Sequence, residues 1–99
     1  MTNFSDMLSK AKAMQDKMKE AQEQIKKIEV EGKAGGNLVK VTLTGDYELK
    51  SITISEEAKK EEREIINDLI IAAYNNAKEN LKKKSTEELS KVTGGLNLP

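Results

Sequence analysis

The sequence predicts an α+β protein in which a three-stranded antiparallel sheet is joined to two long helices. Between residues 28 and 54, apolar and polar side chains alternate with a period of two, which is typical of strands with one buried face. On both sides of this stretch, apolar residues recur every three or four positions, which is typical of amphipathic helices. The chain has 99 residues and no internal repeat or linker, so we expect a single domain over 1–99.

The first predicted element is a helix over 4–27. Its apolar residues follow the alternating spacing of three and four that forms a coiled-coil seam: Phe4, Met7, Ala11, Met14, Met18, Ala21, Ile25 and Ile28. A helix of about 25 residues is about 37 Å long, whereas a compact domain of this size is only about 33 Å across. The helix is therefore predicted to lie on a partner or to project as an arm.

The middle of the chain predicts an antiparallel meander of three strands, over 28–34, 38–44 and 47–54. In the second strand Val39, Val41 and Leu43 share one face, because side chains alternate across a strand. We expect these three residues to form the centre of the core.

Glycines mark the two predicted turns of the meander. Gly35 and Gly36 predict the first turn, and Gly45 predicts a two-residue type II′ turn in which Gly45 has a positive φ. In the third strand the parity of the apolar positions changes, which predicts a bulge near Lys50 and Ser51.

After the sheet, the pattern predicts helices over 56–62 and 64–84, with Ser55 as an N-cap. The longer helix is apolar on nearly all sides in its first half, so we expect it to be buried against both the sheet and a second copy of the chain. Its predicted core and dimer residues are Ile66, Leu69, Ile70 and Ala73. The segment from Ser85 either opens a last short helix over 86–92 or is a weak point in a continuing helix, and a tail over 93–99 follows.

The composition argues against an enzyme. The chain contains no histidine and no cysteine, so the commonest general base, nucleophile and zinc ligands are absent from it. We predict no cofactor, no metal and no small-molecule substrate. No apolar run approaches the roughly 20 residues of a membrane span, and the N-terminus lacks the apolar region of a signal peptide. We therefore expect a cytoplasmic protein without a membrane partner.

Lysines are the candidate binding residues. The 17 basic and 17 acidic residues balance, so bulk charge does not predict a nucleic-acid coat. The distribution is uneven, however: six Lys and four acids give +2 in residues 1–28, five Lys and eight acids give −3 in 29–62, and six basic and five acidic residues give +1 in 63–99.

Cations spaced along a projecting helix can contact DNA phosphates. The predicted contacts, which we expect to sit together in a hairpin of the first and last helices, are Lys10, Lys12, Lys78, Lys82, Lys83 and Lys84. Lysine predominates over arginine and aromatics are absent from these runs, which argues against base readout and against stacking on single strands. The alternative interpretation is an ordinary solvated face.

The chain resembles the YbaB/EbfC family of small bacterial nucleoid-associated proteins over nearly its whole length. The order and spacing of the matching segments, more than any one of them, support the resemblance. These segments are Met14-Gln15-x-x-Met18, Val30-Glu31-Gly32, Gly35-Gly36-x-Leu38-Val39-Lys40-Val41, Gly45, Leu49-Lys50-Ser51-Ile52-x-Ile54, Ala72-Ala73-Tyr74-Asn75-x-Ala77 and Thr93-Gly94-Gly95-Leu96-x-Leu98-Pro99. Tyr74 departs from the family pattern, which commonly has a small aliphatic residue there.

The resemblance implies a tweezer-like homodimer with projecting helices. It also implies largely sequence-tolerant binding of double-stranded DNA, with a role in nucleoid organisation or gene regulation, and hence a location at the nucleoid. The alternative function is a protein–protein adaptor whose amphipathic helices bind a partner helix and which does not bind DNA.

Overall fold

The structure, a computed structural model, describes residues 3–94, and its element order confirms the predicted α+β class. The elements are α1 (Phe4–Lys26), β1 (Glu29–Ala34), β2 (Val39–Thr44), β3 (Leu49–Ile54), a 3-10 turn η1 (Ala58–Lys60) and α2 (Arg63–Gly94). The strands form one antiparallel sheet in the order β1-β2-β3.

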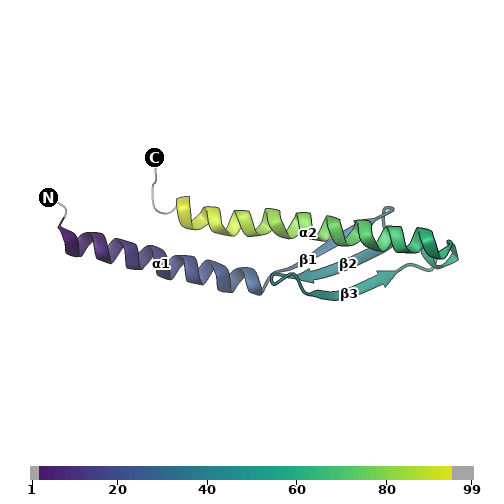
Figure 1. Cartoon of the computed structure of the whole chain (residues 1–99), viewed down its shortest axis with the longest axis horizontal. Helices are drawn as coiled ribbons and strands as arrows, with labels where there is room; N and C mark the ends of the chain where they lie inside the picture. The colour runs from purple at the N-terminus through teal and green to yellow at the C-terminus, as the bar shows by residue number, and fades with distance from the viewer. Residues whose placement is uncertain (1–2, 95–99) are drawn as a thin grey trace.

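The molecule is elongated, with dimensions of 70 × 23 × 16 Å. Its radius of gyration is 19.7 Å, while a compact chain of this length has about 13 Å. The sheet lies at one end, and α2 runs along the sheet and continues past it beside α1 (Figure 1). We call α1 and residues 82–94 of α2 the arm. The N-terminal turns of α1 extend past the end of α2 (Figure 1).

The core lies between α2 and the first two strands. The inward residues of β2 (Val39, Val41 and Leu43) are fully buried, and they pack with Ala73, Ala77 and Leu81 of α2. Leu69 and Ile70 are partly buried against this cluster, and Ile66 is half-buried. Small residues let α2 approach β1 closely: a Cβ atom on Gly32 would lie 2.1 Å from the carbonyl oxygen of Ala73.

The free edge of β1 is capped by α2. The backbone N–H of Lys33 donates to Asn76 Oδ1 at 2.9 Å, and Asn80 Nδ2 donates to the carbonyl oxygen of Glu31 at 2.8 Å. These backbone groups point away from β2, and an uncovered row of such groups invites pairing with other chains. The two asparagines therefore close this edge of the sheet.

The predicted bulge in β3 is confirmed. Thr42 pairs with Ser51 and Leu43 pairs with Leu49, so Lys50 is the extra residue. A bulge can redirect a side chain, and here the Lys50 ammonium forms an ion pair with Glu29 of β1, across β2.

The predicted type II′ turn at Gly45 is wrong. The connection is a three-residue loop of Gly45, Asp46 and Tyr47, in which Tyr47 has φ 64° and Gly45 does not have a positive φ. The N–H of Tyr47 donates to the carbonyl oxygen of Thr44 at 3.0 Å, and the Thr44 N–H donates to the carbonyl oxygen of Glu48 at 2.9 Å. A β-turn followed by a left-handed residue is the common three-residue hairpin loop.

Glycine is required at position 45 for a different reason, which is the close approach of α1. A Cβ atom there would lie 1.6 Å from the carbonyl oxygen of Ile25. In the first turn, by contrast, Gly35 and Gly36 do have positive φ, of 61° and 70°.

Two helix boundaries also differ from the predictions. The short helix expected over 56–62 is only the 3-10 turn η1, with Ser55 Oγ accepting a hydrogen bond from the N–H of Ala58 at 3.0 Å. The segment after Ser85 does not open a separate helix, because α2 continues through it to Gly94. There Thr86 Oγ bonds back to the carbonyl oxygen of Lys82 at 2.9 Å within the helix. From residue 95, the tail expected over 93–99 lies outside the described residues.

Candidate nucleic-acid interface

The arm carries most of the excess positive charge of the chain. It holds nine lysines and six acidic residues, a net +3, while the rest of the chain holds eight basic and eleven acidic residues, a net −3. We call this remainder of the chain the body. The protein as a whole is neutral, but its arm is basic and its body is acidic. An anionic partner is attracted to the arm by this division.

The two predicted lysine groups are exposed, but the fold does not bring them together. α1 and α2 run antiparallel in the arm, where Lys17 and Ala21 lie opposite Val92 and Glu88. Lys10 and Lys12 therefore lie toward the free end of the arm, and Lys82–Lys84 lie at its base. With a rise of 1.5 Å per residue, the two groups are separated by about 20 Å along the arm.

The lysine run at the base is not one compact cluster. Consecutive helical residues point about 100° apart, so Lys82, Lys83 and Lys84 point in three directions. Lys78 and Lys82 are one turn apart and share a face, on which both line the same hollow. Lys78 Nζ lies 5.9 Å from the ring centroid of Tyr74, within the range of a cation–π contact.

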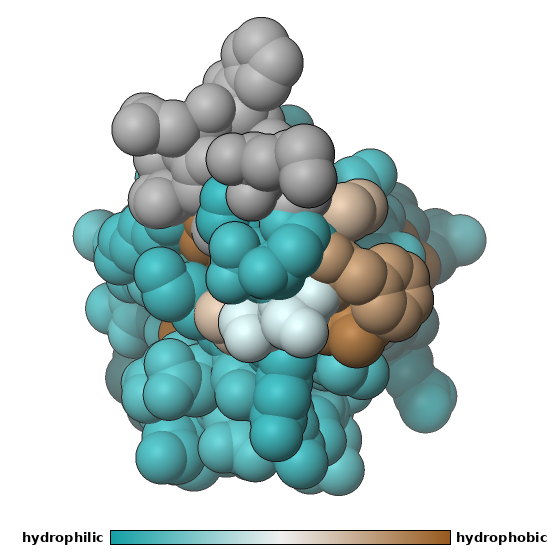
Figure 2. Space-filling model, turned by 90° about the vertical axis from the view of Figure 1, so that its left-hand side faces the viewer, coloured by the Kyte–Doolittle hydropathy of each residue, from teal (hydrophilic) through white to brown (hydrophobic). Residues whose placement is uncertain are grey.

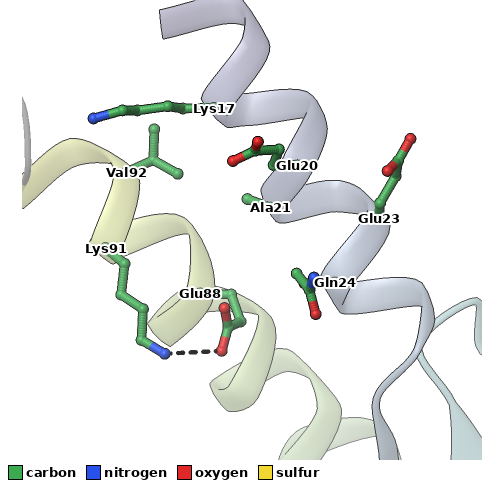
Figure 3. A pocket seen from close by; sticks show the side chains of 8 residues that line it. All are labelled: Lys17, Glu20, Ala21, Glu23, Gln24, Glu88, Lys91 and Val92. Carbon is green, nitrogen blue, oxygen red and sulfur yellow. Dashed lines mark hydrogen bonds and ion pairs between the residues drawn. The ribbon is translucent and has the colours of Figure 1, made fainter.

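The hollow between α1 and α2 is not a phosphate site (Figure 3). It measures about 490 Å³ and is lined by Lys17, Glu20, Ala21, Glu23 and Gln24 of α1 and by Glu88, Lys91 and Val92 of α2. Two lysines and three glutamates give it a net charge of −1. The Lys91 ammonium is already paired with Glu88 at 3.1 Å. The negative lining and the paired Lys91 therefore make this hollow unfavourable for a phosphate.

A second hollow, of about 330 Å³, lies where the β2–β3 loop meets α2. Tyr47 lines it together with Asn75, Lys78, Glu79 and Lys82. This hollow was not predictable from the sequence, because Tyr47 is distant in sequence from the lysines and no sequence signal connects them.

The end of the arm also exposes apolar side chains. Phe4, Met7 and Leu8 of α1 are exposed, and so are Met14 and Met18 farther along the predicted seam. Figure 2, which views this end of the molecule, shows an apolar patch on an otherwise largely hydrophilic face. Of the seam, Ala21 is buried and Ile25 and Ile28 are half-buried. Among residues 3–94, therefore, the seam is covered only where α2 runs beside it.

Residues 3–94 offer neither a metal site nor a membrane-spanning helix. No group of three or more potential metal-ligating side chains occurs in this part of the chain. None of the helices described there is long and apolar enough to cross a membrane.

The sequence profile of the YbaB/EbfC DNA-binding family matches residues 1–96. The chain belongs to this family. The resemblance seen in the sequence is thereby confirmed, and the family is described by DNA binding rather than by an enzymatic activity.

Curated relatives within the YbaB/EbfC family carry consistent names. A nucleoid-associated protein of Afipia carboxidovorans is 43% identical over 100 aligned positions, which cover 100% of this chain and 95% of the relative. Nucleoid-associated proteins of Rickettsia canadensis and Rickettsia felis are 45% and 46% identical, each with 100% of this chain and 94% of the relative covered.

A solved structure shares the YbaB/EbfC fold seen here. The crystal structure of the uncharacterized protein HP0035 from Helicobacter pylori matches with a TM-score of 0.74, covering 94% of this chain and 99% of that chain. The sequences are 18% identical, so this likeness concerns the fold alone.

Proposed function

We propose that the protein binds double-stranded DNA through its lysine-bearing arm, largely independently of sequence, and acts as a nucleoid-associated protein in the cytoplasm, at the nucleoid. The observation that carries this proposal is the +3 charge of the arm opposite the −3 charge of the body. Membership of a DNA-binding family and the names of the relatives support it. A role in organising the nucleoid or regulating genes follows from sequence-tolerant binding.

The contacts are proposed to be made to phosphates. Lys10 and Lys12 act near the end of the arm, and Lys78 and Lys82–Lys84 act at its base. All six side chains are exposed on helices, where lysine supplies a flexible point charge rather than a fixed pattern for reading bases. The exchange of counterions for these lysines makes binding strongly dependent on salt.

The proposed assembly is a homodimer, in which the basic arms are doubled. Leu49 and Ile52 of β3 pair with buried residues of β2 and so face the same side of the sheet, but α2 packs on β1 and β2 and leaves them exposed. Ile71 of α2, exposed at 59%, is nine residues from Asn80, which is about two and a half turns of helix, so the two side chains point to opposite sides of α2. Because Asn80 points to the β1 edge, Ile71 lies on the flank toward β3. A second copy covers this apolar surface in the proposal.

The test of DNA binding is a salt series with a labelled duplex. Reversal of Lys82, Lys83 and Lys84 to Glu should abolish binding to every sequence tested, and reversal of Lys10 and Lys12 should weaken it. Each phosphate contact that is lost should lower the slope of log K against log salt by about 0.9.

The matched control reverses Lys59 and Lys60, which lie in η1 on the acidic body, where Lys59 is paired with Glu56 at 2.9 Å. Binding by this variant should stay close to that of the wild type. If the Lys82–Lys84 variant, folded by circular dichroism, binds duplex like the wild type at matched salt, the proposed contacts are wrong.

The test of the dimer is sedimentation equilibrium of Ile71→Asp. Because Ile71 is exposed within one chain, aspartate there should leave the subunit's own packing intact and should lower the measured mass toward that of a monomer. Leu8→Asp makes the same kind of change at the end of the arm, where 56% of the residue is exposed, and should leave the mass unchanged. A wild-type protein that sediments as a monomer would refute the assembly.

The exposed seam of α1 favours one second candidate, a protein–protein adaptor. Phe4, Met7, Met14 and Met18 could pack on the apolar face of a partner helix. The same salt series separates the two functions, because an adaptor without DNA binding gives no signal with duplex at any salt concentration.

A further inference from the structure

The hollow at the base of the arm combines three kinds of group that recognise nucleotides. It is lined by Tyr47, Asn75, Lys78 and Lys82, residues that carry an aromatic ring, a carboxamide and two ammonium groups. Unpaired nucleotides are bound by an aromatic face for the base and cations for the phosphate. Glu79 is the one acid that lines the hollow, so its net charge is +1.

Tyr47 occupies a backbone position that does not suit it. Its φ of 64° lies in the left-handed region, which favours Gly and Asn and is strained for a bulky residue. The loop is fixed around it: Thr44 Oγ accepts hydrogen bonds from the N–H groups of Asp46 at 3.3 Å and Glu48 at 3.2 Å. A tyrosine therefore stands where a smaller residue would fold more easily, and the residue remains 47% exposed. Within the chain, the strained backbone of Tyr47 is therefore not compensated by burial of its side chain.

The charges around the hollow indicate which part of a nucleotide each lining residue would bind. Tyr47 lies between Asp46 and Glu48, whose carboxylates repel phosphate, so its ring suits an uncharged base. Lys78 and Lys82 are one helical turn apart on the facing helix, which suits the phosphate beside that base. A base paired within a duplex does not expose its face, so the ring can stack only on an unpaired base.

We propose that the hollow formed by Tyr47, Asn75, Lys78 and Lys82 binds an unpaired nucleotide of a nucleic acid strand, with the base stacked on the Tyr47 ring. This site rests on the proposed DNA binding and extends it to single-stranded extensions and gaps at the base of the arm. It revises the expectation from the sequence that no aromatic residue accompanies the lysines.

The binding test compares a short duplex with the same duplex carrying a single-stranded oligothymidine extension. Stacking of one base on an aromatic ring strengthens binding by about 5- to 150-fold, so the extended duplex should bind more tightly by a factor in this range. Tyr47→Asn, which tolerates the left-handed backbone, should lose that preference and keep its affinity for plain duplex. Tyr47→Phe retains the ring and should keep the preference.

The chain also supplies its own optical probe, because it contains two tyrosines and no tryptophan. In Tyr74→Phe, all tyrosine emission comes from Tyr47, and phenylalanine preserves an aromatic ring beneath Lys78. The extended duplex should quench this emission, with plain duplex and free tyrosine amide as controls for absorption by the DNA. This measurement needs no change at Tyr47, so it remains decisive if Tyr47→Asn fails to fold.

The outcomes separate this site from the proposed function. Equal affinity for the two DNAs, with no specific quenching, would overturn the nucleotide site and leave duplex binding intact. Tight binding of the extension by a protein that does not bind plain duplex would support the site and overturn the duplex proposal. A Tyr47→Asn protein that dissociates into monomers and keeps the preference would show that the ring serves the dimer interface, which would also overturn the site.

Discussion

Replacing Gly32 with alanine should separate α2 from the sheet. Gly32 lies in β1 directly beneath α2, where a Cβ atom would be 2.1 Å from Ala73 O and 2.3 Å from Ala77 N. Both of these atoms belong to the helix backbone, so no side chain can turn aside to relieve the contact. The helix or the strand must move by more than about 1 Å, because ordinary van der Waals contact begins at 3.4 Å.

The size of the effect follows from what that movement breaks. Overpacking of a core costs about 1–3 kcal/mol in the free energy of unfolding. Gly32 lies between Glu31 and Lys33, the residues that Asn80 and Asn76 bond at 2.8 and 2.9 Å. A shift of about 1 Å puts both bonds beyond hydrogen-bond distance, at a cost of about 1 kcal/mol each. We expect a total loss of about 3–5 kcal/mol, which lowers Tm by roughly 12–40 °C in a domain of this size.

The assay is urea and thermal unfolding followed by circular dichroism at one fixed protein concentration, because the proposed dimer would make the measured stability depend on concentration. Gly36→Ala is the control: no atom lies within 4 Å of its added Cβ, so only the strain of its φ of 70° remains. That strain costs about 1–2 kcal/mol. If Gly32→Ala is as stable as Gly36→Ala or more so, the close packing of α2 on β1 does not stabilise the fold as argued.

Four further substitutions test other contacts by the same unfolding measurements. Gly45→Ala should lower Tm by at least about 10 °C, because its Cβ atom would lie 1.6 Å from the carbonyl oxygen of Ile25. This is roughly the effect of 2 kcal/mol of overpacking. An unchanged Tm would mean that α1 can move away from this loop without cost. Asn76→Ala and Asn80→Ala should each lower the free energy of unfolding by about 1–3 kcal/mol, because a backbone group of β1 loses its hydrogen-bond partner. An unchanged free energy of unfolding would show that water replaces the lost asparagine side chain. Lys50→Ala should change the free energy of unfolding by no more than about 1 kcal/mol, because its ion pair with β1 is exposed; a larger loss would show that the bulge itself depends on this lysine.

The features that were predictable from the sequence are those determined by local spacing. The alternation of Val39, Val41 and Leu43 predicted a buried face of β2, and all three are fully buried. The change of parity between Leu49 and Ile52 predicted the bulge at Lys50. Such patterns are visible in one segment because each strand buries its own side chains by the same periodicity.

The loop at Gly45 was not predictable in this way. The letters Gly-Asp-Tyr-Glu fit both a two-residue turn with glycine at positive φ and a three-residue loop with its left-handed residue at the third position. The side chain of Thr44, which accepts two backbone N–H groups, stabilises the longer loop. The end of α1 packs against Gly45, so the choice between loops depends on a contact made by a distant part of the chain.

The arrangement of the candidate site could not be predicted from the sequence either, because it depends on how far α1 is displaced along α2. Helix periodicity assigns each lysine a face of its own helix, but only the packing near Ala21 and Glu88 sets the offset between the helices. That offset separates Lys10 from Lys82. The position of Tyr47 beside Lys82 likewise follows from how the sheet docks on α2, which no spacing in the sequence records.

The zero net charge is consistent with DNA binding once the positions of the acids are considered. The acidic run around η1 (Glu56, Glu57, Glu61 and Glu62) lies at the start of α2, at the opposite end of the 70 Å molecule from the free end of α1 (Figure 1). That distance is several times the Debye length of about 8 Å at physiological ionic strength, so these four acids do not cancel the field at the free end of the arm. The same acids repel a duplex that approaches the body. In the proposed binding mode, this division of charge would orient DNA toward the arm, which a uniformly basic surface would not do.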